Sequence, residues 1–260
     1  YKRQVYVNPY DAEYTRAGSY IISAESRRGT NKWEGSAFGF NQGKSMIARN
    51  AFQTVVPNYG RNQLGFNLRG PLIKDKLFLA TSYELTSTNY YLDVNPTASN
   101  TKWDPLYKGS FLAPNKNHTI YNRLTWVQSP SVTYDAMLSA RILDGQGNFG
   151  GKVSQDGGIS QAYKVYTGQL RQRYLASSGN FVNEASLQWV NWDHHELPLK
   201  PGPQFTYPGI VTGTSGFPLI LQENHIRLVD RATLNVDNAS GSHVIKAGVE
   251  LSNVAASQTY

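Results

Sequence analysis

The chain of 260 residues contains no cysteine, which excludes a disulfide scaffold and any thiolate metal site. No stretch approaches the roughly 18 consecutive apolar residues of a membrane-spanning helix. Charged residues make up 17% of the chain, too few for a disordered segment, and aromatic residues make up 12%. The 17 Tyr and 23 Gly favour strands and turns over a helical bundle.

The formal net charge is +7. A nucleic-acid-binding surface gathers its cations on one face. Here they are scattered, and the densest pairs are Lys2-Arg3, Arg27-Arg28 and Lys74 with Lys76. We therefore expect no nucleic-acid partner, and interpret the cations as solvated or as facing lipid headgroups.

Alternating apolar and polar residues recur along most of the chain, with the period of two that is typical of half-buried strands. Leu64, Phe66 and Leu68 alternate with polar residues or glycine, and the run from Val132 to Ile142 alternates over eleven residues. Further strands are predicted around 77–85, 120–126, 163–174, 181–189, 232–236 and 245–251. The fold class is therefore all-β.

The predicted connections alternate between short and long. Short connections fall near 74–76, 129–131, 177–180 and 239–242, and long ones near 41–60, 89–117, 144–162 and 193–225. Outer-membrane β-barrels have short periplasmic turns, long extracellular loops and strands of about 9–11 residues. The alternation of short and long connections favours an antiparallel transmembrane barrel with Trp and Tyr at its membrane interfaces. A soluble β-sandwich with aromatic residues in its core is the alternative interpretation.

The ends of the chain are unlike those of a complete protein. Residue 1 is Tyr, no signal segment follows it, and a strand-like pattern continues through residues 249–260. We therefore expect a segment of a longer polypeptide.

Four ordered motifs between residues 10 and 86 resemble TonB-dependent outer-membrane receptors, in the subgroup with an N-terminal carboxypeptidase-regulatory-like domain. Residues 10–22 (Tyr-Asp-Ala-Glu-Tyr-Thr-Arg onward) are similar to the end of that family's plug. Residues 29–38 resemble its approach to the first barrel strand, and residues 48–52 resemble a loop segment. The most specific match is residues 61–84, with Gly70-Pro71-Leu72-Ile73-Lys74-Asp75-Lys76 at its centre.

The resemblance implies that residues 1–28 are the C-terminal end of the plug domain. Residues 32–260 would form about nine strands of a barrel of about 22. By the same resemblance, the protein takes up a scarce solute across the bacterial outer membrane. Its partners would be outer-membrane lipid and lipopolysaccharide, the unknown solute, and a TonB complex whose contact site lies outside this segment.

Signals for chemistry are weak. The run Asp193-His194-His195-Glu196 contains metal-ligand types. Adjacent strand residues point to opposite faces, so we expect no metal site there. The glycine-rich residues 145–151 lack the Lys-Ser/Thr of a phosphate-binding loop. We expect no catalytic residues, no cofactor and no enzymatic activity.

Loops carry function when a rigid scaffold positions them, so aromatic and imidazole side chains in the predicted extracellular loops are the candidate ligand contacts. The candidates are Tyr90, Tyr91, Trp103, Tyr107, Trp192, His194 and His195. Loop packing is the competing explanation for any one of them. Two other functions stay open: a non-transporting structural or adhesive barrel, and a soluble all-β carbohydrate-binding module.

Overall fold

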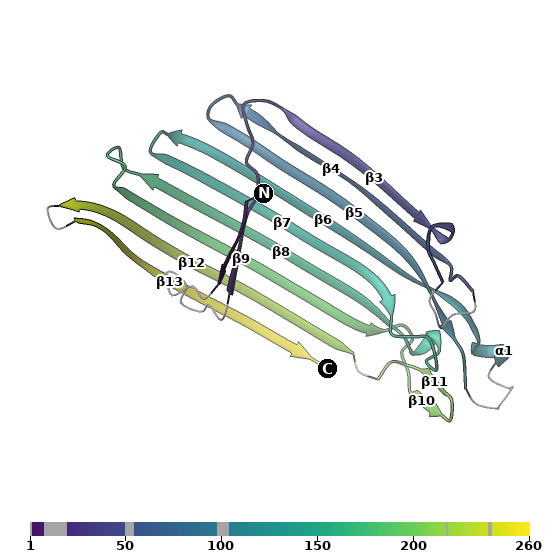
Figure 1. The fold of residues 1–260 in the computed structure, drawn as a ribbon. Helices are drawn as coiled ribbons and strands as arrows, with labels where there is room; N and C mark the ends of the chain where they lie inside the picture. The colour runs from purple at the N-terminus through teal and green to yellow at the C-terminus, as the bar shows by residue number, and fades with distance from the viewer. Residues whose placement is uncertain (1, 8–19, 50–54, 98–103, 217, 239–240) are drawn as a thin grey trace.

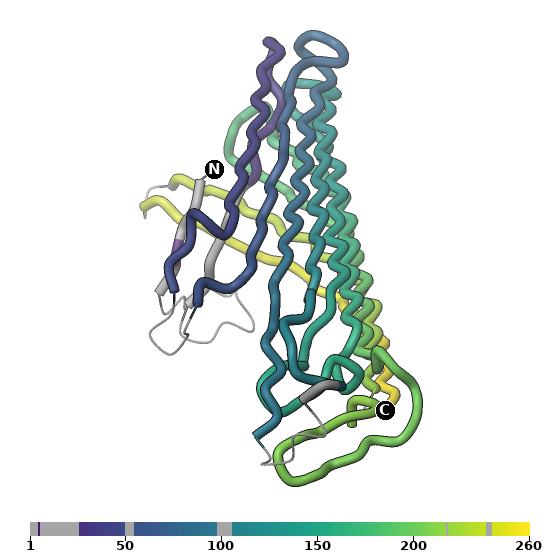
Figure 2. The backbone as a smooth tube through the Cα atoms, turned by 90° about the vertical axis from the view of Figure 1, so that its right-hand side faces the viewer, coloured from purple at the N-terminus to yellow at the C-terminus, as the bar shows by residue number. Residues whose placement is uncertain are grey.

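The computed structural model describes residues 2–7, 20–49, 55–97, 104–216, 218–238 and 241–260. Its main feature is a nine-stranded antiparallel sheet in the order β13-β12-β9-β8-β7-β6-β5-β4-β3. Figures 1 and 2 show this sheet as one twisted layer of long strands. The predicted all-β class and the predicted number of barrel strands are confirmed.

The sheet strands follow one another along the chain as hairpins. They are β3 (Glu34–Gly43), β4 (Tyr59–Ile73), β5 (Leu77–Val94), β6 (Gly109–Ser129), β7 (Val132–Gly147), β8 (Ile159–Leu175), β9 (Phe181–Pro198), β12 (Leu219–Asn238) and β13 (Gly241–Thr259). Two smaller sheets pair β1 (Lys2–Val7) with β2 (Tyr20–Glu25), and β10 (Gln204–Tyr207) with β11 (Ile210–Gly213). The short helices are η1 (Lys44–Met46), α1 (Asp104–Tyr107) and η2 (Gln155–Gly157).

Short and long connections alternate as predicted, but the long ones are shorter than expected. They span 44–58, 95–108, 148–158 and 199–218. Strands of up to 21 residues continue into segments predicted as loops. Towards the long loops, the outward-facing residues of these strands are polar, so the sequence pattern predicts a loop there. The backbone hydrogen bonds between neighbouring strands nevertheless continue.

The two faces of the sheet differ in chemistry. The outer face exposes large apolar side chains on strand after strand, namely Leu64, Phe66, Leu68, Leu124, Trp126, Leu138, Leu170, Leu187, Trp189, Ile226 and Leu228. The inner face carries Glu84, Arg123, Asp135, Arg171 and Glu184, which pair with one another or with polar neighbours. An apolar outside and a polar inside are what a barrel wall in lipid requires.

Apolar burial is concentrated at the long-loop end of the sheet. Val94, Ala113 and Phe149 form a buried cluster, against which Leu92, Phe111, Val153 and Leu199 pack. Across the described residues, no helix is long and apolar enough to cross a membrane.

Candidate functional site

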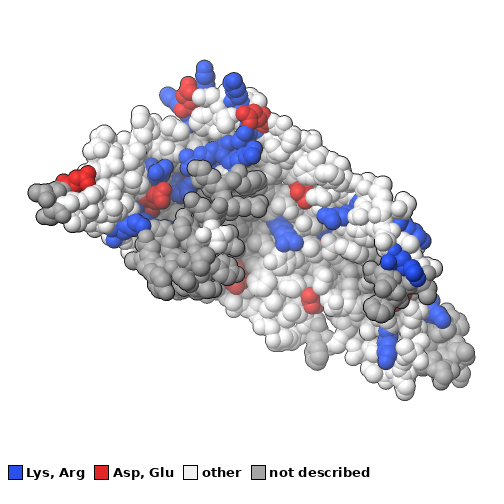
Figure 3. Space-filling model, in the orientation of Figure 1, with Lys and Arg blue, Asp and Glu red and all other residues white. Residues whose placement is uncertain are grey.

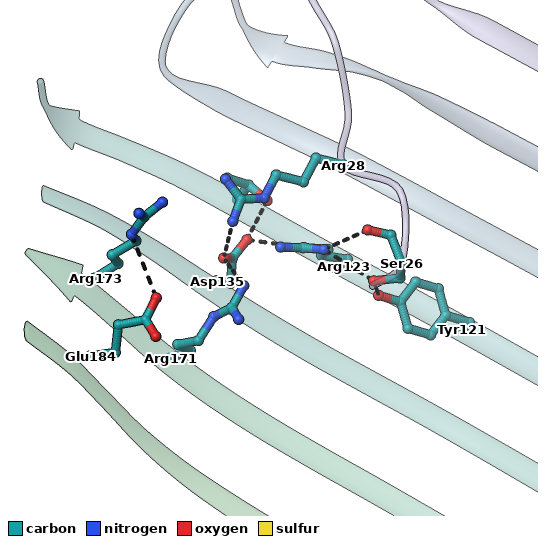
Figure 4. Close-up of polar contacts among 9 residues, drawn as sticks. Ser26, Arg28, Tyr121, Arg123, Asp135, Arg171, Arg173 and Glu184 are labelled. Carbon is teal, nitrogen blue, oxygen red and sulfur yellow. Dashed lines mark hydrogen bonds and ion pairs between the residues drawn. The ribbon is translucent and has the colours of Figure 1, made fainter. Parts of the chain in front are cut away.

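A buried charge cluster lies on the inner face around Asp135 of β7 (Figure 4). The carboxylate accepts hydrogen bonds from Arg123 Nε at 3.0 Å, Thr125 Oγ1 at 2.6 Å and Arg171 Nη2 at 3.1 Å. Arg28 Nη2 lies 3.4 Å from the same carboxylate. The side chains of Asp135 and Arg123 are 3% and 1% exposed. One carboxylate thus contacts three guanidinium groups, of which that of Arg123 is buried while the side chains of Arg171 and Arg28 are 28% and 38% exposed.

The strand register explains why these residues meet. Thr125, Asp135 and Arg171 are direct cross-strand partners on β6, β7 and β8, so their side chains share one row of the inner face. Arg123 lies two residues from Thr125 on the same face of β6. Removing one partner of a buried ion pair leaves the other charge buried and unpaired, which lowers the free energy of unfolding by about 3–5 kcal/mol.

The cluster fastens the segment that leads from β2 to β3. We call residues 26–33 the junction segment. Arg123 Nη1 donates to the carbonyl oxygen of Ser26 at 2.8 Å and to its hydroxyl at 3.0 Å. The Ser26 hydroxyl also hydrogen-bonds to the hydroxyl of Tyr121. Figure 3 shows Lys and Arg side chains gathered where this segment meets the sheet.

Two further contacts hold the rest of the junction segment. A Cβ on Gly29 would lie 2.7 Å from Phe78 Cβ and 2.9 Å from the carbonyl oxygen of Gly70, so this position accommodates no side chain. Asn31 accepts a hydrogen bond from the backbone N–H of Asp75 at 2.9 Å and donates to its carboxylate. Asp75 has a φ of 61° in the short turn, a conformation that Asp tolerates better than most residues. The segment is therefore fixed to β4, β5, β6 and β7.

A second group of inner-face side chains lies nearer the long loops. The ring of His194 is 5.5 Å from that of Tyr163, and the ring of Trp192 is 6.0 Å from the same tyrosine. The Arg141 guanidinium lies 5.8 Å from the Tyr163 ring centre, a cation–π contact. Trp192 Nε1 is buried without a hydrogen-bond partner among the described residues. We call these four residues the aromatic group.

The sequence-predicted ligand contacts are divided between the two faces. Tyr90 (β5), Trp192 and His194 (β9) lie on the inner face, and Tyr90 packs on Tyr59 at 5.7 Å. The register places Tyr91 and His195 on the outer face. Their expected loop location was wrong, because all five lie in extended strands. Tyr107 ends α1 in a long loop, and Trp103 lies outside the described residues.

The two histidines are each engaged with a carboxylate on their own face. His194 Nε2 is 3.3 Å from Glu196, and His195 Nε2 is 2.8 Å from Asp193. Within the described residues no group of three His, Asp or Glu is placed to hold a metal ion.

Sequence reasoning did not single out Ser26, Arg123, Asp135 or Arg171. The short turn at 130–131 alone would pair Thr125 with Ala136, and only a register shift between Val127 and Ser129 brings Thr125 opposite Asp135, so the local sequence did not predict this contact. The contact between Ser26 and Arg123 spans 97 residues and had no local signal.

Three long loops interlock at the other end of the sheet. The loop at 148–158 is hydrogen-bonded to β5, because the N–H of Gly151 donates to the carbonyl oxygen of Asp93 at 2.7 Å. Val211 of β11 donates to Lys152 O at 2.8 Å and accepts from Ser154 N–H at 2.9 Å. Ile210, 1% exposed, is buried in this assembly, while Phe205 and Tyr207 on β10 remain exposed. We call this assembly the loop platform.

A twisted antiparallel sheet with an apolar outer face, a charged inner face and alternating short and long connections is the wall of an outer-membrane β-barrel. The family model described as outer membrane beta barrel domain matches residues 25–188, and the chain belongs to that family. The protein is thus located in the bacterial outer membrane. Comparison with curated protein sequences gives no significant match.

Two solved structures share the fold. The outer membrane transporter YddB from Escherichia coli is 14% identical, with a TM-score of 0.73 over 98% of this chain and 35% of that protein. The siderophore receptor PirA from Acinetobacter baumannii is 14% identical, with a TM-score of 0.61 over 91% of this chain and 32% of that protein. The chain therefore spans about a third of the length of each structure that it matches.

Proposed function

We propose that the chain belongs to a TonB-dependent receptor that takes up a scarce solute across the outer membrane. In this proposal residues 1–28 are the end of the plug domain and residues 32–260 are the first part of the barrel. The observation that carries it is the junction segment, which is fastened to Arg123 and Asp135 on the inner face and to Asp75 in the first short turn. A chain held against the inside of the wall, immediately before the first strand, suits a domain that occupies the lumen.

The free edges of β3 and β13 support a larger barrel. The sheet ends at these two strands, and unpaired backbone N–H and C=O groups are not tolerated in lipid. We propose that further strands close the wall into a barrel of about 22 strands, large enough for a plugged lumen.

The aromatic group is the proposed contact surface for the solute on the wall. Tyr163, Trp192, His194 and Arg141 offer ring faces, an unsatisfied indole N–H and a cation, and they face the lumen near the long loops. Tyr90 on the inner face of β5 and Tyr107 at the end of α1 are further candidate contacts. The TonB complex would supply the energy to displace the plug. The transport role assigns no catalytic task to any of these residues.

The test uses the native protein from the outer membrane in a planar bilayer. A plugged barrel should show little ionic conductance, and mild urea, which unfolds a plug before a barrel, should open large conductance steps. Steady conductance without urea would argue against a plugged receptor. Absence of a heat-dependent gel shift in the outer-membrane fraction would argue against a closed barrel.

The loop platform favours a second candidate, a non-transporting adhesive barrel, because a rigid hairpin holds Phe205 and Tyr207 exposed. If the barrel is adhesive and does not transport, cells should show no energy-dependent uptake that requires this protein, and deleting residues 200–209 should reduce their attachment. The soluble carbohydrate-binding module is not retained, since the protein is located in the outer membrane.

A further inference from the structure

The charge of the inner face differs between the two ends of the sheet. Towards the short turns, three cross-strand rows on β4 to β9 and β12 contain many more guanidinium groups than carboxylates, so this end is positively charged. The charged members of these rows are Arg69, Arg123, Asp135, Arg171, Arg173, Glu184, Arg227 and Arg231.

Three rows nearer the long loops form a surface of different character, which we call the luminal belt. Its middle row contains no Asp, Glu, Lys or Arg along the described strands β4 to β9 and β12. The two flanking rows carry the guanidinium groups of Arg61 and Arg141 and the carboxylates of Glu84, Glu196 and Glu223. Direct cross-strand partners and residues two apart share a face, so these side chains all lie on the inner face. The middle row consists of Gln63, Thr86, Asn117, Leu143, Tyr163, His194 and Leu221.

Two of the charged side chains of the luminal belt are engaged by uncharged groups. Glu196 accepts a hydrogen bond from Gln161 Nε2 at 3.1 Å. Arg141 Nε donates to Asn117 Oδ1 at 3.3 Å, and its guanidinium lies 5.8 Å from the ring centre of Tyr163. An anionic solute would therefore meet one hydrogen-bonded guanidinium with carboxylates in the same row, and a cationic solute would meet that guanidinium beside the rings. The belt is thus electrostatically complementary to neither sign of charge.

The uncharged side chains of the belt match the chemistry of a sugar ring. Gln63, Thr86 and Asn117 carry amide and hydroxyl groups, which both donate and accept hydrogen bonds, as sugar hydroxyls do. The rings of Tyr163 and Trp192 lie 6.0 Å apart at an interplanar angle of 64°. The electron-rich face of an aromatic ring attracts the C–H groups on the face of a sugar. A solute with hydroxyl groups at its edges and C–H groups on its faces can therefore use both kinds of side chain.

We propose that the solute bound at the luminal belt is a neutral oligosaccharide and not an ionic chelate. Its sugar rings stack on Tyr163 and Trp192, and its hydroxyl groups exchange hydrogen bonds with Gln63 and Asn117. From Gln63 on β4 to His194 on β9 the middle row crosses successive strand spacings of about 4.8 Å, or about 24 Å in all, which suits several linked rings. The inference rests on the proposed receptor function, in which the belt lines the lumen near the extracellular loops.

The test is isothermal titration calorimetry on the complete outer-membrane protein in detergent. The probes are neutral hexasaccharides of glucose, xylose, mannose and galactose, compared with hexagalacturonate, a ferric catecholate and spermine. At least one neutral hexasaccharide should bind more tightly than all the ionic probes. Its Kd should change less than about twofold between about 0.05 M and about 0.5 M salt, because binding involves no ion pair that salt could screen. Failure of every neutral hexasaccharide to bind, or tighter binding of an ionic probe, would overturn the proposal.

Two substitutions locate the site on the belt. Tyr163→Ala should weaken binding of the neutral probe about tenfold, because it removes a ring face. Tyr166→Ala is the matched control, since Tyr166 lies on the same strand with its side chain on the outer face. Asn117→Leu should also weaken binding about tenfold, because a sugar hydroxyl loses its hydrogen-bond partner. Equal affinities for Tyr163→Ala and Tyr166→Ala would place the sugar elsewhere and overturn the proposal.

Each variant must retain its heat-dependent gel shift, and if one does not fold, the comparison of probes on the unaltered protein decides the question. Uptake of labelled probes by intact cells, with and without a protonophore, separates the solute class from the receptor function. If a neutral hexasaccharide binds but no probe enters in an energy-dependent manner, the receptor function fails and the solute class stands. Energy-dependent uptake of an ionic probe alone would overturn the solute class and leave the receptor function standing.

Discussion

The indole ring of Trp33 covers Gly70, so closely that a Cβ at this glycine would overlap the ring. Trp33 ends the junction segment, and Gly70 lies on β4 before the first short turn. Gly29 packs against the same strand from the same segment. The chain thus approaches its first sheet strand through a contact that requires glycine at position 70.

Gly70→Ala should destabilise the wall by about 1–3 kcal/mol, because Trp33 must leave its position over β4. The urea midpoint of the detergent-refolded protein measures the effect. Gly60→Ala is the control: it lies on the same strand, and an added Cβ there would meet nothing within 4 Å. Equal midpoints for the two variants would contradict the packing described for Trp33.

Asp135→Asn should cost about 3–5 kcal/mol, because it leaves the buried Arg123 without its charge partner. Glu184→Gln removes a carboxylate from the same inner face, where Arg173 is 3.5 Å away and both side chains are about half exposed. That substitution should cost about 0–1 kcal/mol. Thermal unfolding followed by the gel shift compares the two. A smaller loss for Asp135→Asn than for Glu184→Gln would show that the cluster does not stabilise the wall.

Arg123→Lys should free the junction segment while leaving the barrel folded. The planar guanidinium reaches Asp135 and Ser26 at once, which a single ammonium group cannot reproduce. Limited trypsin digestion should then cut faster after Arg27. Arg227→Lys is the control, since its two hydrogen bonds to Glu250 lie away from this segment. Unchanged cleavage in Arg123→Lys would contradict the fastening role.

Quenchers attached to lipid should reduce the fluorescence of Trp189 much more than that of Trp192. The register places Trp189 on the outer face, where it is 41% exposed, and Trp192 on the inner face beside Tyr163. Single-tryptophan variants in bilayers of brominated lipid should show strong quenching of Trp189 and little of Trp192. Comparable quenching of both would mean that the faces have been assigned wrongly.

Much of the wall could be predicted from sequence, because its pattern is local. The alternation from Val132 to Ile142 gave the correct outer face, and the opposite directions of His194 and His195 followed from strand geometry. The loop lengths were wrong, because outward residues such as Asn89 and Asp193 are polar although their strands continue.

The candidate sites were harder to predict, because they depend on contacts between distant strands. Asp135 and Arg171 meet across a strand pair joined by an eleven-residue loop, whose length does not fix the register. Ser26 reaches Arg123 of β6 only after the chain has passed through three intervening strands, β3, β4 and β5. The resemblance to the end of the plug is based on residues 10–22, and residues 10–19 of that range lie outside the described residues.

The order of strands in the sheet has a consequence for assembly. From β3 to β9, strands that follow one another in the sequence are neighbours in the sheet, and β12 then pairs directly with β9, because β10 and β11 form a separate hairpin. Such a meander keeps loop-closure entropy low at each step, so the wall can grow by one hairpin at a time as the chain is delivered to the membrane. The newest strand then always offers the template for the next, and a stalled intermediate would differ from the finished wall in width rather than in fold.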